Sequence, residues 1–226
     1  MRDMFDAISG AYDFFNHFLS LGIDRYWRKK MMLETKSVQP CEKILDLATG
    51  TADVALSLEK THAGAKIIGV DLSPAMIAKG KEKIDKKDLN DRITLELGDA
   101  ENLRFNDAHF DLVTVAFGVR NFEHLEAGLL EMKRVLRRGG KMVILEFSQP
   151  KGFFFKPLFL FYFKNILPQL GKWFSKDPKA YDYLYESVQE FPDQERFVEI
   201  IKDLGFQNVS LTQLSRGICT IYTAEK

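Results

Sequence analysis

The chain has 226 residues, 46% of them hydrophobic, which is enough to fill the core of one α/β domain. Lys plus Arg and Asp plus Glu both number 32, so there is no basic excess that would attract nucleic acid. The two cysteines and four histidines are scattered without the spacing of a metal site or a disulfide framework, and no apolar run of 18 residues predicts a membrane span.

Residues 1–36 are predicted to form an N-terminal helical cap of one or two short helices. Asp24 is placed to cap the second helix, whose apolar positions include Trp27 and Met31. By helical spacing Tyr12 and Asp13 share a face with Asn16. A packing helix and a lid over a substrate both fit this pattern.

The most informative stretch is the nearly all-apolar run 44–48, which predicts a central strand buried on both faces of a parallel sheet. The small-residue turn 49–51 and a helix follow, and Gly50 lets the backbone approach a ligand closely. The free amides at the start of this helix would face the ligand. A second strand, 67–70, ends at Asp71, where a carboxylate can accept hydrogen bonds from ribose hydroxyls. These features predict an adenosine-type cofactor.

The loop after the first strand indicates which adenosine-type cofactor fits. Only Gly50 of a G-x-G-x-x-G pattern is present, and Asp46 and Asp53 next to it would repel a diphosphate. An acidic loop with one glycine suits a cofactor with a cationic end, and S-adenosylmethionine carries an ammonium and a sulfonium there. Strand-glycine-helix turns also occur without a cofactor, so the loop alone leaves both interpretations open.

Ser73 followed by Pro74 predicts a helix start, with a capping hydroxyl and a proline in the first turn. Ile77 and Ile84 would face inward. The helix and the residues after it carry lysines that we interpret as a solvated face without function: Lys79, Lys81, Lys83, Lys86 and Lys87.

Residues 93–97 predict an edge strand that ends at Gly98-Asp99-Ala100. In a doubly wound sheet this turn would lie beside the first strand and over the same crevice. Asp99 could accept a hydrogen bond from the adenine amino group while the amide of Ala100 donates to the ring. An aspartate that caps the next turn is the alternative.

Residues 110–116 predict the next buried strand, followed by the sequence FGVRN at 117–121. Apolar residues from Leu125 to Leu136 recur at helical spacing, and Gly139-Gly140 would end that helix. Residues 142–147 predict a further central strand. Its Glu146 is costly to bury unless the carboxylate is paired or used.

Residues 150–190 are predicted to be an aromatic insertion. Between 152 and 174 the segment is rich in Phe and carries only lysines as charges, which suits a membrane interface or a wall for a greasy substrate, or simple packing. Asp193 is predicted to cap a helix that ends at Gly205, and 215–217 forms the turn of a closing hairpin. The element count predicts a single α/β domain over 1–226, with the Rossmann-like seven-stranded sheet of class I S-adenosylmethionine-dependent methyltransferases.

Four stretches carry a family resemblance that covers nearly the whole chain: Tyr12-Asp13-x-x-Asn16-x-x-Leu19-Ser20 closing on Trp27, Phe117-Gly118-Val119-Arg120-Asn121, Arg134-Val135-Leu136 with Gly139-Gly140 and Glu146-Phe147-Ser148, and Tyr183-Leu184-x-x-Ser187-Val188-x-x-Phe191-Pro192. They resemble the ubiquinone/menaquinone biosynthesis C-methyltransferase family. The chain departs from the family pattern at Phe15, at Asp24 and at Arg137-Arg138, where the family usually has Met, His and Lys-Pro.

The resemblance implies methyl transfer from S-adenosylmethionine to a ring carbon of a polyprenylated quinol without a metal, with demethylmenaquinol to menaquinol as the leading expectation. It implies cofactor contacts at Thr51, Asp71, Asp99 and Ala100, and a backbone contact at Ala116, where the family often has serine. Asp46 and Gly50 of the loop complete the expected cofactor site.

For catalysis we hypothesise that Arg120 and Asn121 hold the oxyanion that develops on the ring, since arginine stays protonated and acts electrostatically. The proton acceptor stays open, with four candidates: Tyr12, Asp13, His17 and Glu146.

A prenylated substrate implies weak, reversible contact of residues 152–174 with a membrane surface. The charged residues near the N-terminus do not suit a secretory signal, so we expect a cytoplasmic protein that is transiently at the inner face of the cytoplasmic membrane. The oligomeric state is open, with a homodimer as one alternative. Competing functions are a small-molecule O- or N-methyltransferase and a non-catalytic cofactor-binding subunit of a quinone-synthesis complex; a nucleic-acid partner is not expected.

Overall fold

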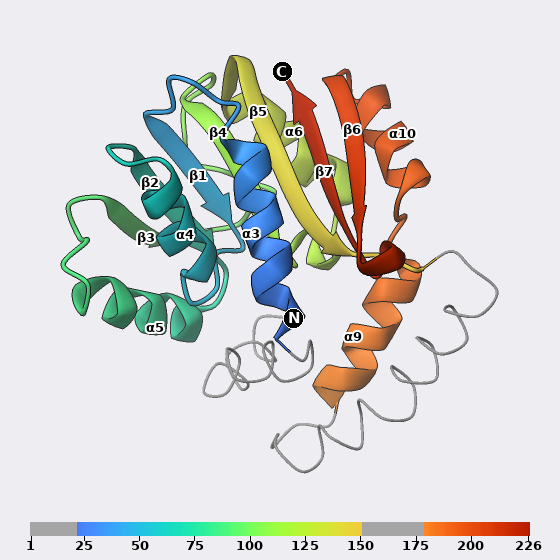
Figure 1. Cartoon of the computed structure of the whole chain (residues 1–226), viewed down its shortest axis with the longest axis horizontal. Coiled ribbons are helices and arrows are strands. Elements are labelled where there is room, and N and C mark those ends of the chain that lie inside the picture. The colour runs from blue at the N-terminus through green and yellow to red at the C-terminus, as the bar shows by residue number, and fades with distance from the viewer. Residues whose placement is uncertain (1–21, 151–178) are drawn as a thin grey trace.

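A computed structural model describes residues 22–150 and 179–226. These residues form a seven-stranded sheet of order β3-β2-β1-β4-β5-β7-β6 (Figure 1). The strands are β1 (Lys43–Leu47), β2 (Lys66–Asp71), β3 (Ile93–Leu97), β4 (Phe110–Ala116), β5 (Leu136–Phe147), β6 (Gln207–Leu214) and β7 (Cys219–Glu225). β1 to β5 pair in parallel, and β7 is antiparallel to both β5 and β6, so the predicted sheet and its closing hairpin are confirmed.

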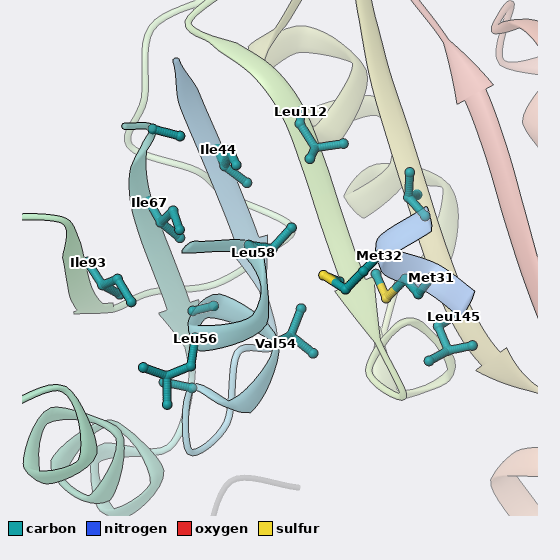
Figure 2. Packing of buried hydrophobic residues seen from close by; sticks show 14 of the residues in the cluster. Met31, Met32, Ile44, Val54, Leu56, Leu58, Ile67, Ile93, Leu112 and Leu145 are labelled. Carbon is teal, nitrogen blue, oxygen red and sulfur yellow. The ribbon is translucent and has the colours of Figure 1, made fainter. Parts of the chain in front are cut away.

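Helices cover both faces of this sheet. They are α3 (Ile23–Thr35), α4 (Asp53–Thr61), α5 (Pro74–Asp85), α6 (Leu125–Val135), α9 (Lys179–Glu190) and α10 (Glu195–Asp203), with short turns η1 (Val119–Asn121) and η3 (Ser215–Gly217). Ile44 of β1 packs in a core with α3, α4 and α5, whereas Leu45 and Leu47 pack in the opposite core with α6 and α10. The first of these cores is drawn in Figure 2. A strand buried on both faces explains the apolar run of β1.

One predicted boundary is wrong. Helix α6 ends at Val135, and Leu136 is extended and pairs with Phe110 of β4, so it begins β5 rather than closing the helix. Gly139 and Gly140 lie inside β5, where their backbones exchange hydrogen bonds with Lys226 at the end of the chain. Strand pairing at both edges therefore overrides the helical spacing of Leu136.

Of three predicted helix caps, only Ser73 is confirmed: its hydroxyl accepts a hydrogen bond from the amide of Met76, 3.1 Å away, and Pro74 opens α5. Asp24 lies in the first turn of α3 instead, where it pairs with Arg28. Asp193 precedes α10, but its carboxylate accepts from the backbone amide of Gln149. Asp24 therefore pairs within its own helix and Asp193 binds the segment after β5, and the N-cap residues of these helices, Gly22 and Gln194, make no side-chain cap.

Candidate active site

A pocket of about 730 Å³, counting the part that is open to solvent, lies beyond the carboxyl ends of β1, β2, β3 and β4. The pocket is lined by Ala48, Gly50, Val70, Asp71, Leu72, Ser73, Met76, Gly98, Asp99, Ala100, Glu101, Phe117, Gly118, Asn121 and Phe122. Four of the seven residues expected at the cofactor are among them: Gly50, Asp71, Asp99 and Ala100.

Asp71 joins the loops that follow β1 and β2. Its Oδ2 accepts a hydrogen bond from the amide of Gly50 at 2.8 Å, and its Oδ1 accepts from the amide of Ser73 at 2.9 Å. Gly50 takes a φ of 55°, a conformation that costs least for a residue without a Cβ. Since each carboxylate oxygen can accept more than one hydrogen bond, Asp71 can hold ribose hydroxyls while it fixes the loops.

Asp99 follows β3 on the same pocket. Its Oδ1 accepts from the amide of Glu101 at 2.9 Å, so the turn-capping role considered for this residue is confirmed. Strand β2 lies between β3 and β1 in the sheet, so the turn after β3 does not adjoin β1 as expected, although it lines the same pocket.

The other three expected cofactor residues lie outside the lining of this pocket. Asp46 is 1% exposed, and its two oxygens accept hydrogen bonds from the hydroxyls of Thr49 and Thr114. Burial raises the pKa of Asp46 to about 6 although both hydroxyls lower it. Thr51 is buried, and its hydroxyl accepts from Lys83. Ala116 packs against the core on the α3 side of the sheet.

The carboxylate of Asp53 forms ion pairs with two cations and is not among the residues that line the pocket. Its Oδ2 lies 2.8 Å from Arg28 Nη1, and its Oδ1 lies 2.7 Å from Lys83 Nζ. Burial raises the pKa of Asp53, but the bonds and charges of these partners outweigh burial and lower it. Lys83 is therefore a partner of the loop and not part of a functionless solvated face. The loop pattern indicated that Asp46 and Asp53 would make the pocket acidic. The acidic residues that line it are instead Asp71, Asp99 and Glu101.

Arg120 and Glu146 form a buried ion pair behind the pocket. Arg120 Nη1 lies 2.9 Å from Glu146 Oε1, and the side chains are 7% and 0% exposed. The guanidinium also donates to the carbonyl of Phe117 and to the hydroxyl of Ser187 in α9. The ion pair thus compensates for burying the charge of Glu146, as its position in a buried strand required. Neither Arg120 nor Glu146 is among the residues that line the pocket.

Asn121 does line the pocket, and its Oδ1 accepts a hydrogen bond from Tyr183 Oη at 3.0 Å. The late motif identified Tyr183 as part of a pattern, but its spacing along one helix gave no sign of a partner 62 residues away. Tyr12, the remaining expected catalytic residue, lies outside the described residues.

An aromatic wall borders the pocket. The rings of Phe117 and Phe147 lie 4.7 Å apart, and Trp27 of α3 packs against both. Phe117 has a φ of 57°, which is uncommon for a bulky residue and costs energy that surrounding structure must offset. Such conformations concentrate at functional sites, and this one lies directly after β4, at the pocket.

The residues present fit a cofactor that combines an adenosine with a small charged tail. The pocket floor is nearly bare backbone, and it is tight: a Cβ on Gly118 would lie 2.4 Å from the Cβ of Ala48. Within the described ranges no group of three His, Cys, Asp or Glu could hold a metal ion. A Rossmann-like sheet with an antiparallel β7 and carboxylates after β2 and β3 defines a class I S-adenosylmethionine-dependent methyltransferase.

Comparison with known proteins supports this class. The profile of the ubiE/COQ5 methyltransferase family matches residues 1–226. Demethylmenaquinone methyltransferase of Bacteroides fragilis is 45% identical, over 100% of this chain and 92% of the relative. Ubiquinone/menaquinone biosynthesis C-methyltransferase UbiE of Geotalea daltonii is 44% identical, over 100% and 96%. A SAM-dependent methyltransferase of Aquifex aeolicus shares the fold with a TM-score of 0.62 at 18% identity, over 87% of this chain and 88% of the other.

The chain belongs to the ubiE/COQ5 methyltransferase family.

Proposed function

We propose that this enzyme methylates a ring carbon of a polyprenylated quinol, with demethylmenaquinol as the substrate and menaquinol as the product. Two curated relatives that align over the full chain carry names of this activity. The observation that carries the proposal is the pocket itself. Carboxylates for an adenosine end lie after β2 and β3, and Asn121 lies after β4 together with Phe117, whose ring packs on Phe147 of β5.

The pocket residues divide into two groups. Asp71 and Asp99 would hold the ribose and adenine of S-adenosylmethionine, over the bare backbone of Gly50. When bound, this cofactor supplies a methyl group on a sulfonium, which leaves readily without a metal. Asn121, at the β4 end, would donate a hydrogen bond to the ring oxygen that gains charge as the ring carbon is methylated.

Arg120 takes a supporting role in this proposal. Its guanidinium is already bonded to Glu146, Phe117 and Ser187, and the ion pair has no net charge to offer an oxyanion. Arg120 would instead hold η1, and with it Asn121, in place. Glu146 is fully buried behind the pocket and accepts three N–H groups, so it has little access to a ring hydroxyl; the other three candidate proton acceptors, Tyr12, Asp13 and His17, lie outside the described residues.

We also propose that the enzyme collects its substrate at a membrane surface, because a polyprenyl tail keeps the quinol in the bilayer. The segment expected to make this contact, 152–174, lies outside the described residues. Among residues 22–150 and 179–226 no helix is long and apolar enough to span a bilayer. Flotation of the protein with liposomes, before and after Phe153, Phe154 and Phe155 are changed to serine, tests the contact; unchanged flotation would reject it.

The decisive experiment presents the purified protein with S-adenosylmethionine labelled on its methyl group and with reduced demethylmenaquinone, beside a demethylated benzoquinol. Mass spectrometry of the products should find the label on a ring carbon of the naphthoquinol. Asp71→Asn removes the charge of the carboxylate proposed to hold the ribose. This variant should bind the cofactor about tenfold more weakly than wild type, a loss of about 1.4 kcal/mol in binding free energy.

Two other outcomes would replace the proposal. Label on oxygen or nitrogen of a soluble phenol or amine would indicate a small-molecule O- or N-methyltransferase. Cofactor binding in wild type with no methyl release to any quinol would indicate a non-catalytic subunit of a quinone-synthesis complex.

A further inference from the structure

The side-chain amide of Asn121 is held from one side only. Its Oδ1 accepts from Tyr183 Oη at 3.0 Å, while Nδ2 makes no hydrogen bond to any residue in the described ranges. An amide has its acceptor and its two donors on opposite sides, so fixing the oxygen also fixes where the N–H groups point. Because Asn121 lines the pocket, an amide oriented in this way has donors available for a ligand.

Helix α9 clamps η1 at two successive positions. Tyr183 bonds to Asn121, and Ser187, one helical turn further along α9, accepts from Arg120 Nε at 3.3 Å. Two contacts one turn apart fix both the position and the rotation of η1 against the helix. The loop after β4 therefore depends on a helix that follows β5 in the chain.

The tyrosine is suited to act as the donor in this contact. Burial raises the pKa of Tyr183, and Glu146 and Glu190 raise it further while Arg120 lowers it. A phenol whose pKa lies above 10 keeps its proton throughout the neutral range. The hydroxyl can then donate to the amide oxygen of Asn121 throughout that range.

The place of Asn121 in the sheet indicates which ligand its donors meet. Asp99 follows β3 and Asn121 follows β4, and β2 and β1 lie between these two strands. Asn121 lies four residues after Phe117, whose ring lines the pocket and packs on Phe147, so its donors meet a ligand on the β4 side, next to this aromatic pair.

We propose that Tyr183 is a positioning residue that orients the amide of Asn121, so that its N–H groups donate to an oxygen of the aromatic acceptor. This rests on the proposed function, because it assumes an acceptor that carries a ring oxygen. A donor aimed at that oxygen strengthens its bond as negative charge grows there, and it therefore favours the transition state over the bound substrate.

The test is a double-mutant cycle on the full-length enzyme, with reduced demethylmenaquinone as the acceptor. Asn121→Ala should lower kcat about a hundredfold, as loss of an oxyanion donor does elsewhere. Tyr183→Phe should lower kcat about tenfold, at the upper end of what one neutral hydrogen bond supports. In the Asn121→Ala background, Tyr183→Phe should have no further effect, because the amide through which the hydroxyl acts is gone.

Two controls separate positioning from a general loss of structure. Tyr185→Phe removes a hydroxyl from the same helix and should leave kcat unchanged. The affinity for S-adenosylmethionine, measured by calorimetry, should stay within about twofold in all variants, a difference of only about 0.4 kcal/mol.

Three results would overturn the proposal: full kcat in Tyr183→Phe, the same fold loss from Tyr183→Phe with and without Asn121, or a loss of cofactor affinity in both single variants. The last would mean that the amide serves the cofactor. If wild type methylates no quinol, the proposed function fails separately. The orienting contact is then decided by NMR, where the Asn121 side-chain amide signals should shift in Tyr183→Phe, and unchanged signals would reject it.

Discussion

Replacing Glu146 by glutamine should destabilise the fold far more than a loss of one charge on the surface would. Glu146 Oε1 accepts from Arg120 Nη1 at 2.9 Å and from the amide of Phe147 at 2.8 Å, while Oε2 accepts from the amide of Arg120 at 3.3 Å. In Glu146→Gln the one remaining side-chain oxygen can take the place of either Oε1 or Oε2, but not both. The new NH2 group then faces an N–H, donor against donor.

The magnitude follows from burial. With the carboxylate gone, the charge of Arg120 stays 7% exposed with only neutral partners, and breaking a buried ion pair by removing one partner costs about 3–5 kcal/mol. Arg120→Met should cost a similar amount, because it leaves the carboxylate unpaired. The double variant should lose less than the sum of the two, with a coupling free energy of about 2–3 kcal/mol.

Urea unfolding at neutral pH, followed by circular dichroism, measures the free energy of unfolding for all four members of the cycle. The pair Arg104–Glu96 provides the matched control, since its atoms lie 3.9 Å apart and its side chains are 73% and 36% exposed. The coupling of such an exposed pair should stay below about 1 kcal/mol. A buried pair whose coupling is no larger than that of the control would refute the reasoning.

Three further predictions follow from buried groups. The pKa of Asp46 is raised on folding from 3.8 to about 6, so its stabilising contribution is fully present below pH 4 and is lost as the pH rises through 6. Asp46→Asn removes this loss. The free energy of unfolding of the variant relative to wild type, measured with urea, should therefore rise by roughly 3 kcal/mol between pH 4 and pH 7, and a pH-independent difference would contradict this. Gly69→Ala would place a Cβ 2.5 Å from Leu95 Cδ2 and should lower the free energy of unfolding by about 1–3 kcal/mol, so an unchanged urea midpoint would show that the site can relax. Lys83→Met should raise the pKa of Asp53 toward its ordinary value in an NMR titration, whereas a lysine without a role would leave that titration unchanged.

Much of the architecture could be predicted from local patterns. The apolar run of β1, the Ser73-Pro74 start of α5 and the hairpin of β6 and β7 depend on burial, capping and turn chemistry that act over a few residues. The place of Asp71 and Asp99 in the pocket could be predicted for the same reason, because a residue at the carboxyl end of a parallel strand lies at the edge of the sheet where ligands bind in this architecture.

Local patterns failed where a side chain had a choice of partners. Asp46 and Asp53 looked like the acidic rim of the pocket, yet Asp46 is buried between two threonines and Asp53 lies between two cations. Leu136 matched a helical stripe, yet pairing with β4 made it a strand residue. In each case the competing partner is distant in the chain, so no short window contains it.

The amino-acid sequence by itself determined the order of strands and helices and the edge of the sheet at which a ligand binds, because strand alternation, helix spacing and turn preferences are set by neighbours in the chain. Only the tertiary structure decided which polar groups meet: Glu146 with Arg120 across 26 residues, and Tyr183 with Asn121 across 62. Those contacts form only when packing brings separate elements within about 3 Å, a distance that hydrogen bonds require and that residue spacing does not encode.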